Sequence, residues 1–182
     1  MFYEKIAERG LCVANQRVLD LGTGTGVLPR NMYTYGANWT GTDISQQQIE
    51  EAKALARQMN QNISYFCVSA EDISFTSHTF DVITACQCFW YFDYERLLPK
   101  LLQYLKPEGR LLFLYMAWLP QEDAIAGASE QLVLKYSPNW SGAREYMHPI
   151  SLPDCVYEVF EPVAHEEYAL DIPLPENPGM GE

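Results

Sequence analysis

Short apolar runs alternate with segments of helical periodicity over the first two thirds of the chain. The runs predict strands that are buried on both faces, because a strand covered on both sides carries a nearly continuous apolar sequence. Five such runs lie at residues 17–21, 38–44, 63–68, 80–87 and 110–116. Alternating strands and helices predict an α/β fold with a doubly wound, mostly parallel sheet.

The helices are predicted from caps and apolar stripes, and they fall at residues 2–9, 45–60 and 122–136. Ser45 and Gln48 match a capping box. Ile49, Ala52, Ala56 and Met59 then recur at helical spacing. A further helix follows the fourth strand, with Pro99 in its first turn, where the missing N–H costs nothing. The segment 106-KPEG-109 predicts a turn.

The last third of the chain is less regular. Residues 163–172 predict a sixth strand, and the Pro- and Gly-rich residues 173–182 predict an extended tail. The expected organisation is an α/β core over 1–117, a lid and sixth-strand region over 118–172, and the tail.

The charge and the cysteine content indicate which classes of partner and which compartment to expect. The 182 residues carry 12 Lys and Arg against 24 Asp and Glu, for a net charge of −12. This balance argues against nucleic acid and against an anionic membrane surface. The five cysteines are an odd number, which favours reduced thiols in a cytoplasmic protein. No apolar run approaches the roughly 20 residues that cross a bilayer.

The stretch 18-VLDLGTGTGVLPR-30 places three glycines where a strand ends and a helix begins. Glycines there allow positive φ and let a ligand approach the backbone. The dinucleotide fingerprint is G-x-G-x-x-G, and Gly26 comes one residue too early for it. Asp20 precedes the first glycine by two residues. Its carboxylate would repel a pyrophosphate and suits a cationic ligand.

Two more acids follow strands. Asp43 ends the second strand and can accept hydrogen bonds from both hydroxyls of a ribose. Asp72, in 69-SAEDISF-75, follows the third strand and can accept from the exocyclic amine of adenine, although a solvated loop acid is an alternative.

Together with 80-FDVITACQCFWYFD-93, these motifs resemble those of the class I S-adenosylmethionine-dependent methyltransferases, in the small-molecule branch. The resemblance covers about residues 15–117. It implies a Rossmann-like sheet of strand order 3-2-1-4-5. It also implies transfer of a methyl group from S-adenosylmethionine to a small-molecule acceptor, with S-adenosylhomocysteine as product.

The resemblance also assigns site residues. The cofactor-binding set is Asp20, Gly22, Thr23, Gly24, Gly26, Asp43, Ile44, Ala70, Glu71, Asp72, Cys86 and Gln87. The substrate-binding set is Trp90, Tyr91, Tyr115 and Trp118. A general base is needed only if the acceptor must lose a proton, and the candidates are Tyr91, Tyr115 and His148.

Several alternatives stay open. The pattern lacks the final strand usual in this fold, so the fifth strand should have an unpaired edge and the chain could form a homodimer through it. A non-catalytic cofactor-binding module and, less favoured, an NAD-dependent oxidoreductase are the other function classes. Strand alternation puts the thiols of Cys86 and Cys88 on one face, as arsenite chemistry would need, but no third thiol is nearby and no metal site is expected.

Overall fold

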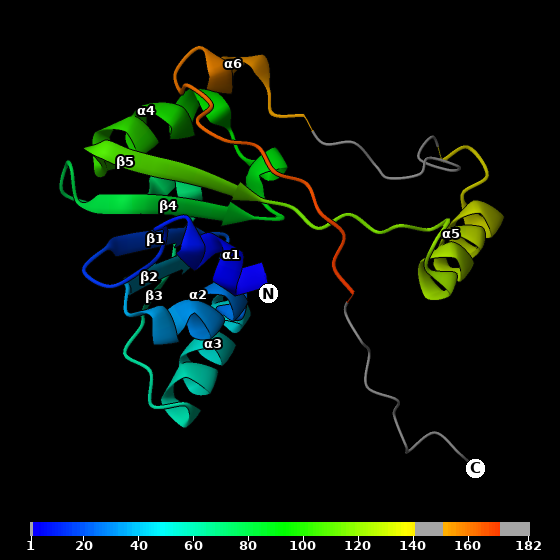
Figure 1. Cartoon of the computed structure of the whole chain (residues 1–182), viewed down its shortest axis with the longest axis horizontal. Helices are drawn as coiled ribbons and strands as arrows, with labels where there is room; N and C mark the ends of the chain where they lie inside the picture. The colour runs from blue at the N-terminus through cyan, green and yellow to red at the C-terminus, as the bar shows by residue number, and fades with distance from the viewer. Residues whose placement is uncertain (1, 141–150, 172–182) are drawn as a thin grey trace.

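The structure is a computed structural model, and it describes residues 2–140 and 151–171. Five strands form one parallel sheet in the order β3-β2-β1-β4-β5 (Figure 1), which confirms the predicted fold class and strand order. The strands are β1 (Arg17–Leu21), β2 (Asn38–Asp43), β3 (Ser64–Cys67), β4 (Phe80–Cys86) and β5 (Leu105–Leu114). β1 is central, with β2 on one side and β4 on the other. The order therefore reverses at β1, where ligands bind in open α/β sheets.

Helices cover both faces of the sheet. The helices of the described residues are α1 (Phe2–Glu8), α2 (Val27–Met32), α3 (Gln46–Gln58), α4 (Tyr94–Tyr104), α5 (Ala124–Tyr136), which does not contribute to this cover, and α6 (Asp154–Tyr157), with short 3-10 turns η1 (Tyr33–Tyr35), η2 (Ala70–Asp72) and η3 (Phe89–Tyr91). α1 and α2 bury Ile6, Leu28 and Met32 against Val18 and Val82. These strand residues occupy one face because side chains alternate along a strand.

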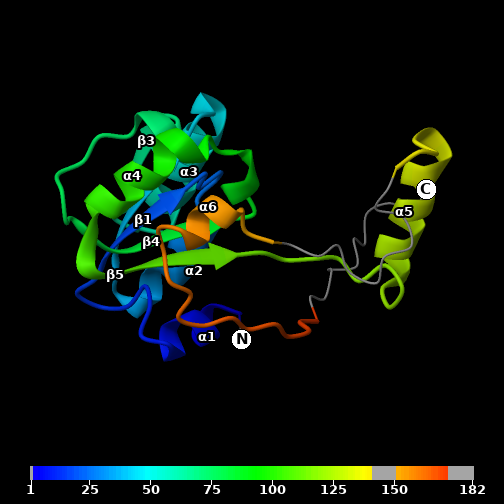
Figure 2. The ribbon, with the colours of Figure 1, turned by 90° about the horizontal axis from the view of Figure 1, so that it is seen from above.

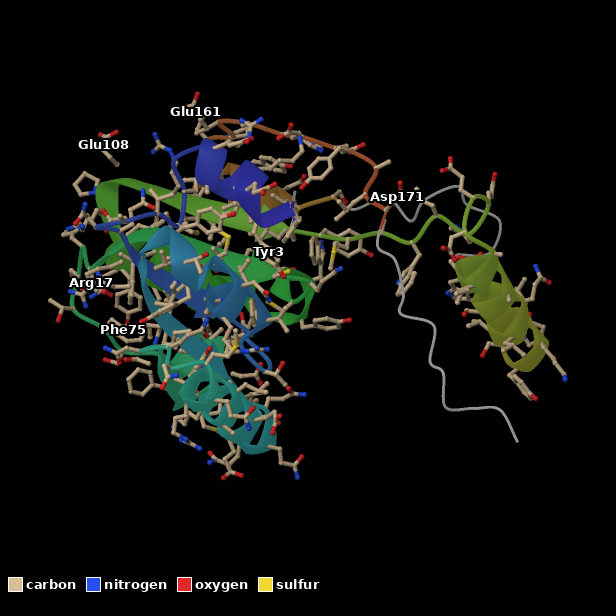
Figure 3. All side chains as sticks on the ribbon, turned by 60° about the horizontal axis from the view of Figure 1, so that its bottom comes forward. Tyr3, Arg17, Phe75, Glu108, Glu161 and Asp171 are labelled. Carbon is tan, nitrogen blue, oxygen red and sulfur yellow. The ribbon has the colours of Figure 1, made fainter. Side chains whose placement is uncertain are left out.

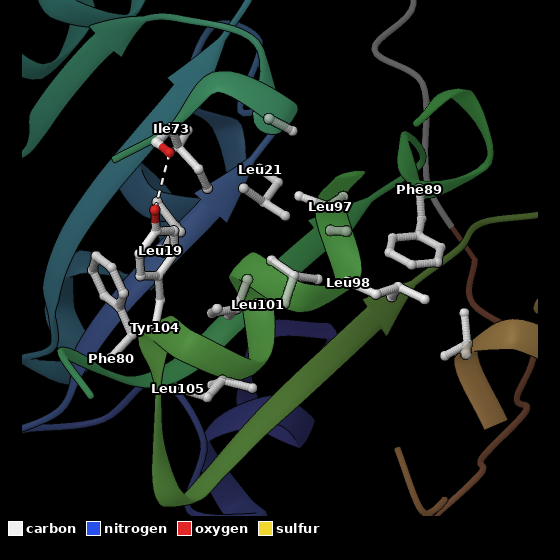
Figure 4. Close-up of a cluster of buried hydrophobic side chains, with 14 residues drawn as sticks. Leu19, Leu21, Ile73, Phe80, Phe89, Leu97, Leu98, Leu101, Tyr104 and Leu105 are labelled. Atoms are coloured by element: carbon white, nitrogen blue, oxygen red, sulfur yellow. Dashed lines mark hydrogen bonds between the residues drawn. The ribbon is translucent and has the colours of Figure 1, made fainter. Parts of the chain in front are cut away.

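The opposite face is covered by α4, α6 and η3. Leu19 and Ile83 of the sheet pack there with Leu97 and Leu101 of α4 (Figure 4). The hydroxyl of Tyr104 donates to the carbonyl of Ile73 at 3.0 Å, so the polar atom of this buried ring is satisfied.

Two local predictions around α4 were wrong. The helix begins after Asp93, whose carboxylate accepts from the N–H of Arg96 at 3.3 Å, and Pro99 therefore lies inside the helix instead of in its first turn. Residues 106–109 lie within β5 instead of preceding it. Phe80 pairs with Leu105 and Val82 with Arg110, so these four residues form a local irregularity of the strand.

The C-terminal third departs most from expectation. The helix predicted over 122–136 is present as α5, and it stands apart from the sheet in both views (Figures 1 and 2). The predicted strand over 163–172 is wrong for residues 163–171, which form no strand. Side chains attach this segment to α1 and the turn after it instead, since Lys5 of α1 and Arg9 of the turn pair with Glu166.

Some sequence predictions are not tested by the residues that the structure describes. Residue 172 and the tail 173–182 lie outside the described residues, and the division at 117 and 172 stays a prediction. β5 is an edge of the sheet, as expected. Within the described ranges, no helix has both the length and the apolar character that crossing a bilayer would require.

Candidate functional site

The glycine loop follows β1 at the carboxyl edge of the sheet. Gly22, Gly24 and Gly26 have φ of 58°, 56° and 74°, which L residues rarely adopt. Packing also explains two of them: a Cβ on Gly22 would lie 2.8 Å from the Sγ of Cys88, and one on Gly26 would clash with the Tyr65 ring. Above Gly24 the nearest atom would be 3.9 Å away, on Gln48. The backbone of Gly24 therefore faces open space that a ligand can enter.

Asp20 lies beneath this loop, with 2% of its surface exposed. Its two carboxylate oxygens accept from the hydroxyls of Thr23 and Thr84, each at 2.6 Å. Burial raises the pKa of Asp20 to about 6, against the lowering effect of both hydroxyls. The Asp20 carboxylate thus stabilises the glycine loop through its hydrogen bond with Thr23. A role toward a ligand ammonium stays a prediction, and it would run through Thr23 or a water molecule.

Asp43 joins the loop to the end of β2. Its Oδ2 accepts from the N–H of Gly24 and its Oδ1 from the N–H of Ser45, both at 2.9 Å. The N–H of Thr23 donates to the carbonyl of Thr42, also at 2.9 Å. Each oxygen of Asp43 keeps a free lone pair, because a carboxylate offers about four acceptor sites. The next residue, Ile44, is 78% exposed. It presents an apolar surface beside a hydrogen-bond acceptor.

The third loop places Ala70, Glu71 and Asp72 on η2. Ser69 donates to Asp72 at 2.9 Å, and Arg96 of α4 pairs with it at 2.6 Å. The Ser69 hydrogen bond, together with Arg96, lowers the pKa of Asp72. Asp72 is therefore ionised but already engaged. Sequence reasoning missed Arg96, because no motif links it to a residue on another element.

The side chain of Glu71 is engaged too, since its Oε1 accepts from the N–H of Asp93 at 2.9 Å. Asp93 itself caps α4, which gives its carboxylate a structural role. The carboxylates of Glu71, Asp72 and Asp93 mostly hold the local chain in place. Recognition of an adenine ring would therefore depend on backbone groups of η2 and on the free lone pairs of Asp72.

The end of β4 supplies Cys86 and Gln87. Gln87 has φ of 62°, and its Nε2 donates to the carbonyl of Met116 at 2.9 Å. Cys86 packs on the face covered by α1, whereas Cys88 packs on the α4 face and donates to the carbonyl of Leu21 at 3.1 Å. The prediction that both thiols share one face was wrong, because the strand ends at Cys86 and the left-handed Gln87 turns the chain.

Both thiols are neutral. Burial raises the pKa of Cys86 to about 11 and that of Cys88 to about 12. In the parts of the chain that the structure describes, no group of three or more His, Cys, Asp or Glu residues is arranged to hold a metal ion.

Aromatic residues follow β4 and β5. Trp90 and Tyr115 lie with ring centroids 5.3 Å apart, and the indole N–H of Trp90 donates to the carbonyl of Ser151 at 3.0 Å. Tyr91 and Trp118 are 86% and 70% exposed. The structure thus brings Trp90 and Tyr115 together and leaves Tyr91 and Trp118 on the surface. His148 lies outside the described residues.

Sequence reasoning predicted the first helix, at residues 2–9, but it missed that Tyr3 lies near the candidate site. Tyr3 of α1 packs against the same cluster as Cys86, and burial, with the Cys86 thiol second, raises its pKa. Nothing in the sequence around residue 3 signals this position, because it depends on how α1 crosses the sheet.

Comparison with known proteins agrees with this geometry. Residues 18–109 match the methyltransferase domain family. A ubiquinone biosynthesis O-methyltransferase of Coxiella burnetii is 33% identical over 110 residues, which are 60% of this chain and 47% of that protein. This chain therefore spans about half the length of the curated relatives it matches.

Two solved structures extend the comparison. An S-adenosylmethionine dependent methyltransferase from Mesorhizobium loti is 26% identical with a TM-score of 0.52, covering 61% of this chain and 52% of that one. The [4+2]-cyclase SpnF is 28% identical with a TM-score of 0.57, covering 62% and 43%. The fold thus hosts more than one reaction. The matched residues include the glycine loop, Asp43, η2 and β4, and the chain belongs to the methyltransferase domain family.

Proposed function

We propose that this chain binds S-adenosylmethionine and transfers its methyl group to a small-molecule acceptor. The observation that carries the proposal is the position of Asp43 at the carboxyl edge, where it orders Gly24 and retains acceptor capacity beside the exposed Ile44. A nucleoside needs this combination: an acceptor for two ribose hydroxyls and an apolar surface for the base.

The remaining residues fit the rest of the cofactor. Gly22, Thr23 and Gly24 would line the methionine part, with Gly26 ending the loop and Asp20 supporting it from below. Ala70, Glu71 and Asp72 would meet the adenine, while Cys86 and Gln87 would lie near the sulfonium. The open backbone at Gly24 supports this assignment.

The cofactor supplies a reactive sulfonium, and methyl transfer from it is an in-line displacement. The residues of this chain orient the reactants and exclude water, which are the main contributions left to the protein. Cys86 is suited to a position beside the sulfonium. Its thiol is neutral at neutral pH, so it is not a thiolate that could take the methyl group in place of the acceptor.

The acceptor site would be formed by Trp90, Tyr91, Tyr115 and Trp118. The edge-to-face pair of Trp90 and Tyr115 supports an apolar or aromatic acceptor. Because the Coxiella burnetii relative is named an O-methyltransferase, hydroxylated aromatic compounds are the first acceptors to screen. Tyr91, Tyr115 and His148 remain the candidates for a general base.

We also propose a cytoplasmic protein that binds neither nucleic acid nor membrane and that forms a homodimer through β5. The net charge of −12 supports the absence of binding to nucleic acid and to an anionic membrane. The five cysteines, all free in the structure, support a reducing compartment. The position of β5 at the sheet edge supports self-association.

Thermal unfolding with S-adenosylmethionine, S-adenosylhomocysteine and NADH tests the cofactor. A ligand at about 100 times its Kd stabilises the folded chain by roughly 2.7 kcal/mol. A rise in Tm with S-adenosylhomocysteine that is lost in Asp43→Ala supports the proposal. A rise with NADH alone would support an oxidoreductase, and binding without turnover on any acceptor would support a non-catalytic module.

A further inference from the structure

α1 crosses the sheet from one edge to the other. It ends near the amino edge, where the next two residues, Arg9 and Gly10, border a hollow together with Asp81 and Lys106. Its first turn lies at the other edge: Figure 3 shows Tyr3 on the side of the sheet opposite to Arg17, which begins β1. The first turn of α1 therefore reaches the carboxyl edge, where the glycine loop and the end of β4 are found.

The surroundings of Tyr3 belong to the candidate site. Tyr3 packs against the same buried cluster as Cys86, which ends β4, and Leu114, which ends β5, and the Cys86 thiol lies close enough to affect the pKa of Tyr3. Its ring is only partly buried, and it contacts Phe2 edge-to-face with centroids 5.1 Å apart. Burial raises the pKa of its hydroxyl, the Cys86 thiol raises it further, and the Arg30 guanidinium of α2 acts in the opposite direction. Tyr3 thus places a partly exposed aromatic ring near the end of β4.

α1 is held in this position by the C-terminal segment. Arg9 donates to Glu166 at 2.8 Å, Lys5 pairs with Glu166 at 3.5 Å, and the Lys5 ammonium lies 4.3 Å from the centre of the Tyr168 ring. Ile6 is buried in the core beneath. Contacts on both sides of the helix fix the direction of Tyr3, so its position is defined by packing.

We propose that Tyr3 contacts the sulfonium end of the bound cofactor and makes the site prefer S-adenosylmethionine over S-adenosylhomocysteine. The inference rests on the proposed function. A sulfonium is a cation, and an aromatic ring attracts a cation held over its face. S-Adenosylhomocysteine lacks the methyl group and the positive charge, and the rest of the molecule is the same. The ratio of the two affinities therefore reports on contacts at the sulfur.

Isothermal titration calorimetry on Tyr3→Leu, Tyr3→Phe and the parent chain tests this. We expect Tyr3→Leu to weaken S-adenosylmethionine about fivefold more than S-adenosylhomocysteine, as loss of one cation–π contact predicts. Tyr3→Phe keeps the ring and should keep the ratio within about twofold. Tyr35→Leu is the matched control, because Tyr35 packs against the same cluster from η1, on the chain leading into β2. It should leave the ratio unchanged.

A second measurement needs no variant. Hydroxyl-radical footprinting of the parent chain should show that S-adenosylmethionine protects Tyr3 and leaves Tyr35 as reactive as before. An unchanged affinity ratio in Tyr3→Leu, or no protection of Tyr3, would overturn the inference while the cofactor assignment stands. Failure of the parent chain to bind either ligand would instead refute the proposed function.

Discussion

The carboxylate of Asp43 accepts a hydrogen bond from the backbone N–H of Gly24 at 2.9 Å, across 19 residues of sequence. This bond joins the ends of two neighbouring parallel strands. It fixes the left-handed Gly24 with its open face outward, and it orients Asp43 through a second bond to Ser45. The geometry of the proposed nucleoside site thus depends on one side chain, to which the proposal also gives a direct contact with the ligand.

Asp43→Asn should damage binding more than folding. The amide can accept from one of the two N–H groups, but its NH2 then faces the other donor. We expect the affinity for S-adenosylhomocysteine to fall at least about tenfold, since loss of a charge-assisted bond costs roughly 1.5–3 kcal/mol. Calorimetry at neutral pH measures the loss. An unchanged affinity would mean that this carboxylate does not touch the ligand.

The three loop glycines should respond differently to alanine. Gly22→Ala places a Cβ 2.8 Å from Cys88 Sγ, so we expect it to lower the free energy of unfolding by about 1–3 kcal/mol. Gly24→Ala meets open space, so its backbone strain should cost only about 1 kcal/mol while its methyl group obstructs the ligand.

Gly10→Ala is the control for this comparison. Gly10 has φ of 70° with nothing within 4 Å of its added Cβ, and it lies two residues after the end of α1. It should match Gly24→Ala in urea unfolding and leave binding of S-adenosylhomocysteine intact. Equal binding by Gly24→Ala and Gly10→Ala would contradict the ligand position.

The sheet could be predicted from sequence because its signals are local. The apolar runs, the Ser45 cap and the glycine spacing each act within a few residues, and β1 was predicted with its exact observed limits, Arg17–Leu21. The sixth strand could not be judged this way. Residues 163–171 carry a suitable pattern, but they do not pair with the edge strand β5, and Glu166 instead pairs with Lys5 of α1 and with Arg9 just after it.

The positions of the candidate site residues were predictable from sequence where, as for the sheet, the signals are local. Asp43 was expected at the end of the second strand, where the structure places it, and its contact with a cofactor stays a prediction. The pairing of Asp72 with Arg96 and the approach of Tyr3 to Cys86 depend on tertiary packing between distant elements, which spacing in the sequence does not encode.

The edge of β5 should make the chain associate as its concentration rises. An edge strand presents a row of N–H and C=O groups that a second copy can pair with. Sedimentation velocity over a concentration series should show a shift from monomer to dimer. Hydrogen exchange of the peptide covering residues 110–114 should slow over the same range. A monomer at every concentration would contradict the edge-to-edge proposal.

Asp20 should make stability depend on pH in an unusual direction. Its folded pKa of about 6 lies above the ordinary 3.8, because burial disfavours the charged carboxylate. Between these values the folded state holds a proton that the unfolded state has lost, so the Asp20 contribution to stability falls as pH rises and is constant above about 6.

Asp20→Asn removes that titration while keeping the shape of the side chain. Its Oδ1 can accept from Thr23, and its Nδ2 can donate to the hydroxyl of Thr84, which has the carbonyl of Leu19 3.4 Å away as another acceptor. Relative to the parent, the variant should gain on the order of 2–3 kcal/mol between pH 4 and pH 7. Urea unfolding across that range measures the difference, and groups such as Asp81, whose pKa is lowered, cancel because both proteins share them. A stability difference that is constant with pH would mean that Asp20 is already ionised in the folded chain at pH 4, with its charge supported by the two threonine hydroxyls.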